Sequence, residues 1–340
     1  MNCRSMIMGI AAGAMFAVAA GAQAPGYHIV ASYPLGGDGS WDYLAFDGVG
    51  HRVFIARQNR MMVVDPASGK LLGEIPGIDG SHGVAFSQAN HRGFATSGHD
   101  SSVVMFDLTT LKPLKKIPAA IDADAILFDP VTKFVFTMNG DAHSSSVINP
   151  VSGTNIGTIP LGGKPEFGVS AGDGKLYANM TEQGEVVEID AAKMKVTRRW
   201  SVAPCASSTG MSIDVRHHRL FTVCRNKYLA VSDYQAGKLV ATEPIGSGVD
   251  ASVFDPATQL IFAANGDGTM TVVHEDTPDH YTVVETDSTG PGAKTMTLDP
   301  MTHRVYLGTA TFGTVPATSG RRGRPPVLPG TFKLLVLDRK

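Results

Sequence analysis

VFIAR (53–57) is the first of seven short apolar segments that hold equivalent positions along the chain, and it is followed by GFATS (93–97), VFTMN (135–139), LYANM (176–180), LFTVC (220–224), IFAAN (261–265) and VYLGT (305–309). A repeat of roughly 40–45 residues built from short strands is typical of propeller blades. The repeat covers nearly everything after the first 40 residues. The sequence therefore predicts an all-β fold, a seven-bladed β-propeller with four-stranded antiparallel blades.

The first repeat shows how one blade divides into strands. Apolar residues alternate or run continuously through YLAFD (43–47), HRVFIAR (51–57), MMVVD (61–65) and LLGEIP (71–76), as expected for buried and half-buried strands. The last repeat stops at a third strand, whereas YHIVASYPL (27–35) resembles a fourth strand that no repeat precedes. Because a closed ring leaves no inner edge unpaired, we expect this N-terminal strand to close the ring beside Leu334–Leu337.

The N-terminus has the pattern of an export signal. Arg4 precedes the apolar run IMGIAAGAMFAVAA (7–20), and Ala20-Gly21-Ala22 fits a small-x-small cleavage site. We expect residues 1–22 to be removed, which leaves 23–340 as one propeller domain in the periplasm or outside the cell. A retained anchor is the alternative, although the run is shorter than the roughly 20 residues of a membrane-spanning helix.

Signal removal takes Cys3 with it and leaves Cys205 and Cys224. In an exported protein two cysteines usually pair. The repeat places Cys205 just before a first strand and Cys224 at the end of the neighbouring second strand, so antiparallel pairing brings them together. A disulfide is expected, with two free thiols or two metal ligands as the other readings.

Composition narrows the classes of partner. The formal net charge is −2, which gives no general reason to expect nucleic acid or an anionic membrane surface. A closed ring needs no second chain in order to fold, so a monomer is expected.

The repeat also carries a family resemblance. Second strands that end in a small residue or Asn, third strands that end in Asp, and Pro/Ser/Gly turns resemble the YVTN-repeat β-propeller family, also called YncE-like proteins. VFTMN (135–139) and IFAAN (261–265) are most similar to the repeat, whereas GFATS and LYANM depart from it. The resemblance implies an exported protein with a ligand-binding role, and it supplies no catalytic signature.

In a propeller the first strands line the channel, and the loops that lead into them open on one face together with the second-to-third strand loops. The residues that lead into the seven first strands are Asp42, His82, Asp124, Glu166, Thr209, Asp250 and Lys294. The second strands add Arg57, Asn139, Asn226 and Asn265, and Trp41 beside Asp42 could stack on a ligand. Because ligands favour concave mouths, we expect the binding site here.

Converging carboxylates repel one another unless a cation intervenes. One solution is a bound divalent cation, Ca²⁺ or Mg²⁺ on oxygen ligands, or Zn²⁺ or Mn²⁺ if a histidine takes part. The other is neutralisation by Arg57, Arg225 and Lys294, with water in the channel.

The loop TFGTVPATSGRRGRPPVLPG (311–330) is the longest second-to-third strand connection. Loops of this length are usually functional or disordered. It is expected either to fold over the mouth, with Arg321, Arg322 and Arg324 against carboxylates or an anionic ligand, or to remain a mobile solvated loop.

Three functions remain open. The first is an exported binding or scaffold protein whose mouth holds a small molecule, a metal ion or a protein ligand. The second is a metal-dependent, lactonase-like hydrolase with Glu166, Asn226 and Asp250 as metal ligands. The third, a subunit of a redox complex, has no cofactor-ligand pattern in the sequence to support it.

Overall fold

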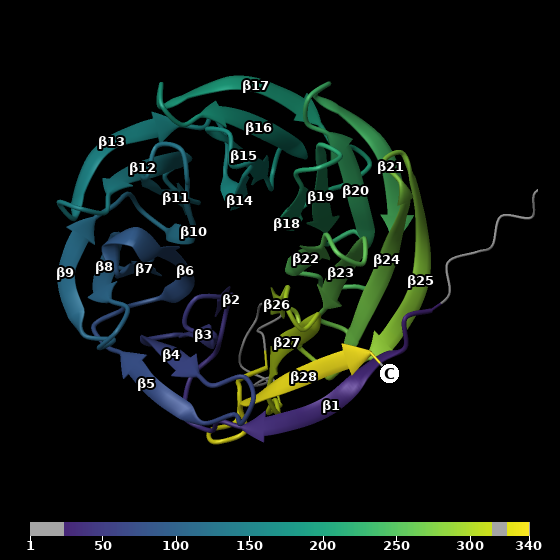
Figure 1. The fold of residues 1–340 in the computed structure, drawn as a ribbon, viewed down its shortest axis with the longest axis horizontal. Helices are drawn as coiled ribbons and strands as arrows, with labels where there is room; N and C mark the ends of the chain where they lie inside the picture. Colours follow the sequence, from purple (N-terminus) through teal and green to yellow (C-terminus); the bar gives the residue numbers. More distant parts are fainter. Residues whose placement is uncertain (1–23, 315–324, 340) are drawn as a thin grey trace, which may run out of the picture.

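Seven four-stranded antiparallel sheets surround a central channel (Figure 1). The structure is a computed structural model that describes residues 24–314 and 325–339. In each sheet the first strand lies at the channel and the fourth at the circumference. The predicted seven-bladed β-propeller is therefore confirmed.

The first four blades follow one another along the chain. Their strands are, for blade 1, β2 (Leu44–Asp47), β3 (Arg52–Arg57), β4 (Arg60–Val64) and β5 (Leu71–Ile75); for blade 2, β6 (Ser81–Ser87), β7 (Arg92–Ser97), β8 (Ser102–Asp107) and β9 (Pro113–Pro118); for blade 3, β10 (Ala123–Phe128), β11 (Val135–Asn139), β12 (Ser144–Asn149) and β13 (Thr154–Pro160); and for blade 4, β14 (Pro165–Ser170), β15 (Lys175–Met180), β16 (Glu185–Asp190) and β17 (Lys195–Ser201). A short 3₁₀ helix, η1 (Gln88–Asn90), is the only helix in the described part of the chain.

The remaining blades complete the circle. Their strands are, for blade 5, β18 (Ser208–Asp214), β19 (Arg219–Cys224), β20 (Tyr228–Asp233) and β21 (Lys238–Pro244); for blade 6, β22 (Ala251–Asp255), β23 (Leu260–Asn265), β24 (Thr269–Thr277) and β25 (His280–Ser288); and for blade 7, β26 (Met296–Asp299), β27 (Arg304–Thr309), β28 (Lys333–Arg339) and β1 (Tyr27–Pro34).

Blade 7 joins the two ends of the chain, as predicted. Tyr33 of β1 is opposite Leu334 of β28, and Tyr27 is opposite Arg339. Tyr27 is buried, its ring lies 4.9 Å from that of Phe262 in an edge-on arrangement, and its hydroxyl donates to the carbonyl of His303 at 2.9 Å. The closing strand is therefore anchored by a buried side chain as well as by the sheet.

The core consists of apolar clusters between neighbouring blades. Between blades 1 and 2, for example, Phe54 and Ala56 pack with Val84 and Phe106. Strands buried on both faces supply these side chains, which explains the continuous apolar segments of the repeat.

A disulfide joins Cys205 and Cys224, with a Cα–Cα distance of 5.5 Å. It ties the segment before β18 to the end of β19, so the predicted pairing is confirmed. The expected signal, residues 1–22, lies outside the described residues. In the part of the chain that the structure covers, no helix has the length and apolar character needed to cross a membrane.

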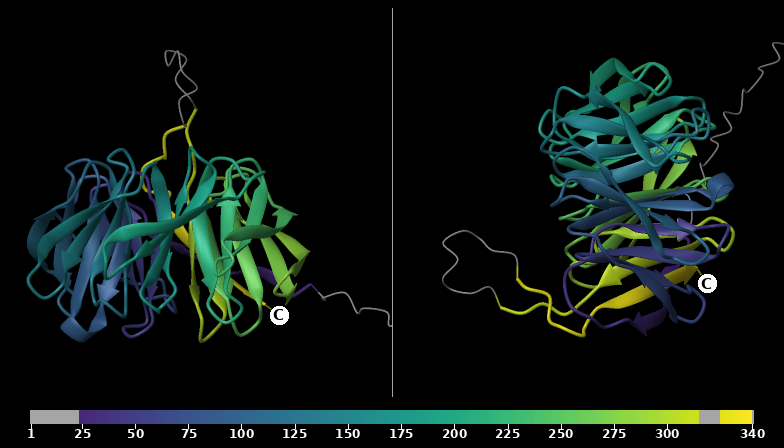
Figure 2. Two further views of the ribbon diagram at one scale, coloured as in Figure 1. Left: turned by 90° about the horizontal axis from the view of Figure 1, so that it is seen from above. Right: turned by 90° about the vertical axis from the view of Figure 1, so that its left-hand side faces the viewer.

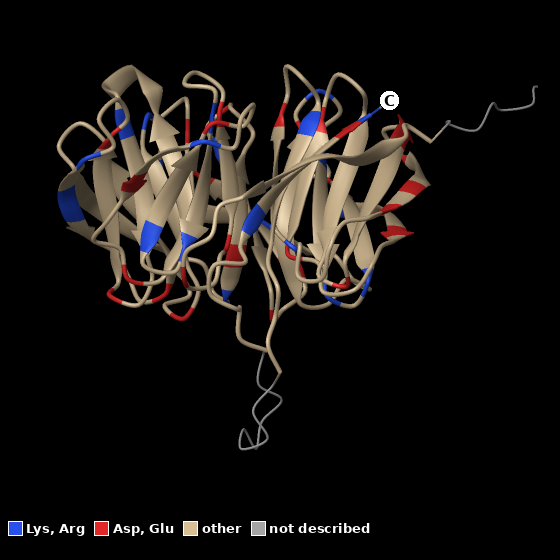
Figure 3. Ribbon diagram, turned by 90° about the horizontal axis from the view of Figure 1, so that it is seen from below, with Lys and Arg blue, Asp and Glu red and all other residues tan. Residues whose placement is uncertain are grey.

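Seen from the side, the blades form a disc, and residues 311–314 and 325–330 rise from one of its faces (Figure 2). Basic and acidic positions are interspersed over the strands and loops in the view of Figure 3. The charge is thus mixed in sign on this view, in keeping with the small net charge of the sequence.

Candidate functional site

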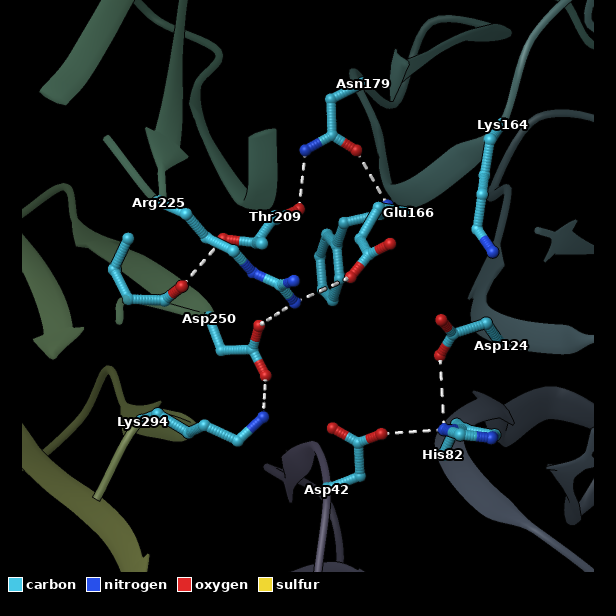
Figure 4. Close-up of polar contacts among 12 residues, drawn as sticks. Asp42, His82, Asp124, Lys164, Glu166, Asn179, Thr209, Arg225, Asp250 and Lys294 are labelled. Atoms are coloured by element: carbon cyan, nitrogen blue, oxygen red, sulfur yellow. Dashed lines mark hydrogen bonds and ion pairs between the residues drawn. The ribbon is translucent and has the colours of Figure 1, made fainter. Parts of the chain in front are cut away.

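The residues that lead into the first strands gather at one mouth of the channel. Each first strand begins on this face of the disc, so residues spread from position 42 to position 294 become neighbours. Figure 4 shows their side chains around the channel: Asp42, His82, Asp124, Glu166, Thr209, Asp250 and Lys294. The predicted convergence of these seven positions is therefore present in the structure.

One half of the mouth is a histidine between two aspartates. The Nδ1 atom of His82 lies 2.7 Å from Oδ2 of Asp42 and 3.5 Å from Oδ1 of Asp124. Burial lowers the pKa of His82, but the hydrogen bond to Asp42 and the charge of Asp124 outweigh it and raise the pKa to about 9. His82 is therefore a cation at neutral pH, and it offsets carboxylate charge that would otherwise repel.

The Asp124 side chain is largely enclosed, with 17% of its surface exposed. Burial raises its pKa well above the ordinary value, the charge of His82 lowers it, and the charges of Asp42 and Glu166 raise it further. Ligand atoms of Asp42, His82 and Asp124 all lie within 4.8 Å of one another. This trio could hold a divalent cation if His82 gave up its proton.

The other half of the mouth is a set of ion pairs around Asp250. Lys294 forms an ion pair with Asp250, and Nη2 of Arg225 lies 3.4 Å from Oδ1 of Asp250 and 3.7 Å from Oε1 of Glu166 (Figure 4). Burial, followed by the charge of Asp250, raises the pKa of Glu166 to about 7, although Arg225 lowers it. Neutralisation by Arg225 and Lys294, one of the two expected solutions, is thus present.

An aromatic contact crosses the channel beneath this ring. Tyr43 of blade 1 and Phe167 of blade 4 have ring centroids 4.9 Å apart, although their blades are separated by two others. Burial raises the pKa of Tyr43 well above its ordinary value, and the charges of Asp124 and Asp250 raise it further. This contact therefore bridges the channel below the ring of polar residues. The sequence did not predict it, and its signal there was an aromatic residue directly after Asp42.

A cavity of about 1070 Å³ opens at the mouth beside blades 5, 6, 7 and 1. Its polar lining includes Asp42, Arg225, Asp250, Asp267 and Lys294. Its apolar lining includes Trp41, Phe312, Pro325, Pro326 and Val327. A cavity of this size with few polar groups on an apolar wall has the character of a small-molecule site.

The long loop builds part of that wall. Phe312 and Val327 form an isolated antiparallel bridge, which holds the two ends of the loop together. Trp41 packs against Phe312 and Phe332 with ring centroids 6.0 and 5.2 Å away, and only 8% of it is exposed. Trp41 thus fills core space and lines the cavity at once. The expected lid arginines, Arg321, Arg322 and Arg324, lie outside the described residues.

Arg57 is not at the mouth, which corrects the expectation that it neutralises the ring. It is fully buried, and its guanidinium donates to the carbonyls of Gly36, Asp38, Gly39 and Ser40 at 3.1–3.3 Å and stacks 3.9 Å from the Phe332 ring centroid. Burial lowers its pKa to about 10. Arg57 therefore fixes the loop that precedes Trp41 and contacts the site only through it.

The expectation that Asn139 and Asn265 contribute to the mouth is also wrong, because both side chains are buried inside their blades. The amide of Asn139 donates to the hydroxyls of Ser144 and Ser146 at 3.2 and 3.1 Å. That of Asn265 donates to two threonine hydroxyls of the next strand at 3.1 and 3.0 Å. These asparagines join second to third strands and take no part in the mouth.

The three residues expected as metal ligands, Glu166, Asn226 and Asp250, each contact other protein groups in the structure. Asn226 is exposed, accepts from the amide of Ala206 at 3.0 Å and donates to the carbonyl of Pro204 at 2.7 Å, so it holds the loop before β18. The Arg225 guanidinium lies within 4 Å of both Glu166 and Asp250. A guanidinium in that place competes with a metal ion. Among the described residues, ligand atoms of Asp42, His82 and Asp124 lie close enough together to hold one.

No family model matches the sequence, and no curated protein matches it. Among solved structures, a chain of hydrazine synthase from Kuenenia stuttgartiensis is similar in fold, with a TM-score of 0.71. The match covers 79% of this chain and 92% of that chain at 16% sequence identity. At this identity the likeness establishes the β-propeller fold and carries no function with it.

Proposed function

We propose that this chain is an exported binding protein whose channel mouth takes a small amphiphilic molecule. The observation that carries the proposal is the cavity of about 1070 Å³, which has an apolar wall on one side and charged groups on the other. Export is supported by the Cys205–Cys224 disulfide, because such bonds persist in oxidising compartments. The YncE-like resemblance of the repeat agrees with this role.

The apolar wall selects the body of the ligand. Trp41, Phe312, Pro326 and Val327 present flat or rigid side chains to the cavity, and such surfaces lose little conformational entropy when a ring packs on them. An aromatic or alicyclic group is the occupant that this wall favours.

The charged side selects the polar end. Lys294 and Arg225 are both paired with Asp250, and Asp42 is paired with His82. Because these charges already have partners, a ligand with a net charge would have to displace one of them at a cost in desolvation. Hydroxyl, amide or zwitterionic groups can instead share the existing donors and acceptors.

The contacts of the expected ligands weigh against the hydrolase alternative, since the Asn226 side chain bonds to a loop and Arg225 lies within 4 Å of both Glu166 and Asp250. A metal-dependent activity would have to use Asp42, His82 and Asp124. The test of the proposal therefore includes an arm with a chelator, together with a screen of lactones and esters.

The two tryptophans of the chain provide the test. Trp41 lines the cavity, whereas Trp200 is buried in the outer strand of blade 4. In a Trp200→Phe background, Trp41 fluorescence reports on the cavity alone. Titration with a library of small aromatic and alicyclic alcohols, amides and amino acids is expected to give saturable changes for some members.

Substitution at the mouth should then weaken binding of those members. Lys294→Met is expected to weaken it by roughly ten- to a hundredfold, since a hydrogen bond to a charged group contributes roughly 1.5–3 kcal/mol. Lys193→Met, at an exposed turn of blade 4, is the matched control and should bind like the parent. Equal affinity in both variants, or turnover of an ester that chelation abolishes, would contradict the proposal of a non-enzymatic mouth site.

A further inference from the structure

A second group of potential metal ligands lies on the face of the disc opposite the mouth. β18 starts at the mouth and ends at Asp214, and His217 follows in the turn to β19. Glu275 lies near the end of β24 in the neighbouring blade (Figure 1). Asp214, His217 and Glu275 therefore bring side chains of blades 5 and 6 together.

The three side chains are close and largely buried. Nδ1 of His217 lies 2.7 Å from Oδ2 of Asp214 and 3.3 Å from Oε1 of Glu275, and one ligand atom from each residue lies within 4.8 Å of the other two. The exposed fraction is 3% for the Asp214 side chain, 0% for that of Glu275 and 22% for that of His217. The group is closed on the carboxylate side and open to solvent at the imidazole.

Several polar atoms of this group lack a hydrogen-bond partner. They are Oδ2 of Asp214, Oε2 of Glu275 and Nδ1 of His217. Although Nδ1 is near both carboxylates, neither approach has the geometry of a hydrogen bond. A buried carboxylate oxygen without a partner is costly, so the arrangement calls for a cation or a proton among these atoms.

The neighbouring guanidinium of Arg219 does not pair with the unpartnered oxygens of Asp214 and Glu275. Arg219 forms ion pairs with Asp279 at 2.7 Å and with Asp233 at 3.3 Å, and it donates to the carbonyls of Pro278 and His217. The remaining contacts of the group are the amide of Arg216, which donates to Oδ1 of Asp214, and the hydroxyl of Tyr281, which lies 3.4 Å from Oε1 of Glu275. Two carboxylates are thus balanced by a single imidazole.

Another histidine–aspartate pair on the same face, His303 with Asp255, has both carboxylate oxygens in hydrogen bonds to the protein. Nδ1 of His303 lies 2.7 Å from Oδ2 of Asp255, which also accepts from the hydroxyl of Thr258 at 2.6 Å, while Oδ1 accepts from the amide of Ala257 at 3.1 Å. No second carboxylate joins His303 in the described part of the chain. At blades 5 and 6 the histidine and the aspartate come from the same blade, three residues apart, and Glu275 of the neighbouring blade adds a second carboxylate.

We propose that Asp214, His217 and Glu275 form a binding site for a divalent transition-metal ion of the zinc class, which links blade 5 to blade 6. One imidazole nitrogen and two carboxylate oxygens suit Zn²⁺, and the exposed side of His217 leaves room for water as a further ligand. The ion would satisfy the unpartnered oxygens and cancel the repulsion between Asp214 and Glu275. Its role is to stabilise the contact between the two blades.

A proton shared between Asp214 and Glu275 is the competing solution. Burial, and then the charge of Asp214, raise the pKa of Glu275 to about 7. A shared proton would relieve the repulsion without any metal ion, so the two solutions differ in whether added zinc is bound and raises the melting temperature.

Calorimetric titration of the chelator-treated protein with ZnCl₂ tests the proposal, with thermal unfolding as a second readout. One zinc ion is expected to bind and to raise the melting temperature. Glu275→Gln and His217→Asn should each weaken zinc binding at least about tenfold, since even the loss of an outer-shell contact costs 10–100-fold. Glu275→Gln relieves like-charge repulsion, so this variant is expected to fold without metal.

Two control variants locate the ion. His303→Asn removes a histidine from the same face, and His82→Asn disrupts the metal-capable trio at the mouth. Both are expected to keep the zinc affinity of this site. The proposal is overturned if the parent binds no more zinc than Glu275→Gln, or if binding depends on His82 or His303 and not on Glu275.

Discussion

At the scale of the residue, the mouth is a set of ion pairs in place of an open acidic ring. His82 lies between Asp42 and Asp124, and Asp250 lies between Lys294 and Arg225. The sequence could place these residues on one face, because the blade repeat fixes where each first strand begins. It could not predict the pairing, which depends on side-chain directions at loop ends that no periodic pattern determines.

Glu166 gives the mouth a pH dependence that can be measured. Its pKa is raised from 4.5 to about 7, chiefly by burial. Between those two values the folded protein binds a proton that the unfolded chain has released, so the free energy of unfolding falls as the pH rises through this window. Glu166→Gln should therefore be more stable than the parent at pH 8, by about 1–3 kcal/mol, and nearly equal to it at pH 5.

Urea unfolding at the two pH values measures this difference. Glu182→Gln, at an exposed position of the same blade, serves as the control and should show no such change between pH 5 and pH 8. A Glu166→Gln variant that is less stable than the parent at pH 8 would mean that the ion pair with Arg225 outweighs the cost of burying the charge.

At the scale of the element, the strands were predictable and the side chains at their ends were not. VFTMN (135–139) and IFAAN (261–265) were correctly recognised as second strands, yet their terminal Asn139 and Asn265 turn inward to serine and threonine hydroxyls of the third strands. Arg57 likewise ends β3 but holds the loop 36–40. Local hydrogen bonds determine the directions of these side chains, and the sequence repeat does not indicate which hydrogen bonds form.

The closing strand β1 is an element whose removal should have a large effect. Without residues 27–34 the outer edge of β28 and the pocket of Tyr27 are exposed to water. Because burial and strand pairing are both lost, the melting temperature is expected to fall by about 10 °C or more. Differential scanning calorimetry of the shortened protein measures the effect.

A synthetic peptide of residues 25–36 distinguishes loss of this strand from general damage. Added in excess, it should pair with β28 and restore most of the melting temperature. If the shortened protein melts at the parental temperature without the peptide, the ring does not depend on this closure.

At the scale of the whole molecule, the seven-bladed ring makes one site from residues far apart in the chain. The ring itself follows from the repeat, and so does the common face of the polar residues. Departures from sevenfold symmetry do not follow from the repeat. Tyr43 reaches across the channel to Phe167, and Phe312 and Val327 of the long loop add a wall on one side of the mouth only. The first feature bridges the channel and the second lines the cavity, and each occurs once, so no repeat could reveal them.

The position of a bound molecule is the most direct test of the claim that this cavity is the functional site. A crystal structure of the protein with the tightest-binding member of the alcohol, amide and amino acid library should show the ring of that molecule against Trp41 and its polar end within hydrogen-bond reach of Asp250 or Lys294. Density for the molecule on the outer strands, at a blade interface or on the opposite face, with the mouth filled by water alone, would contradict the account.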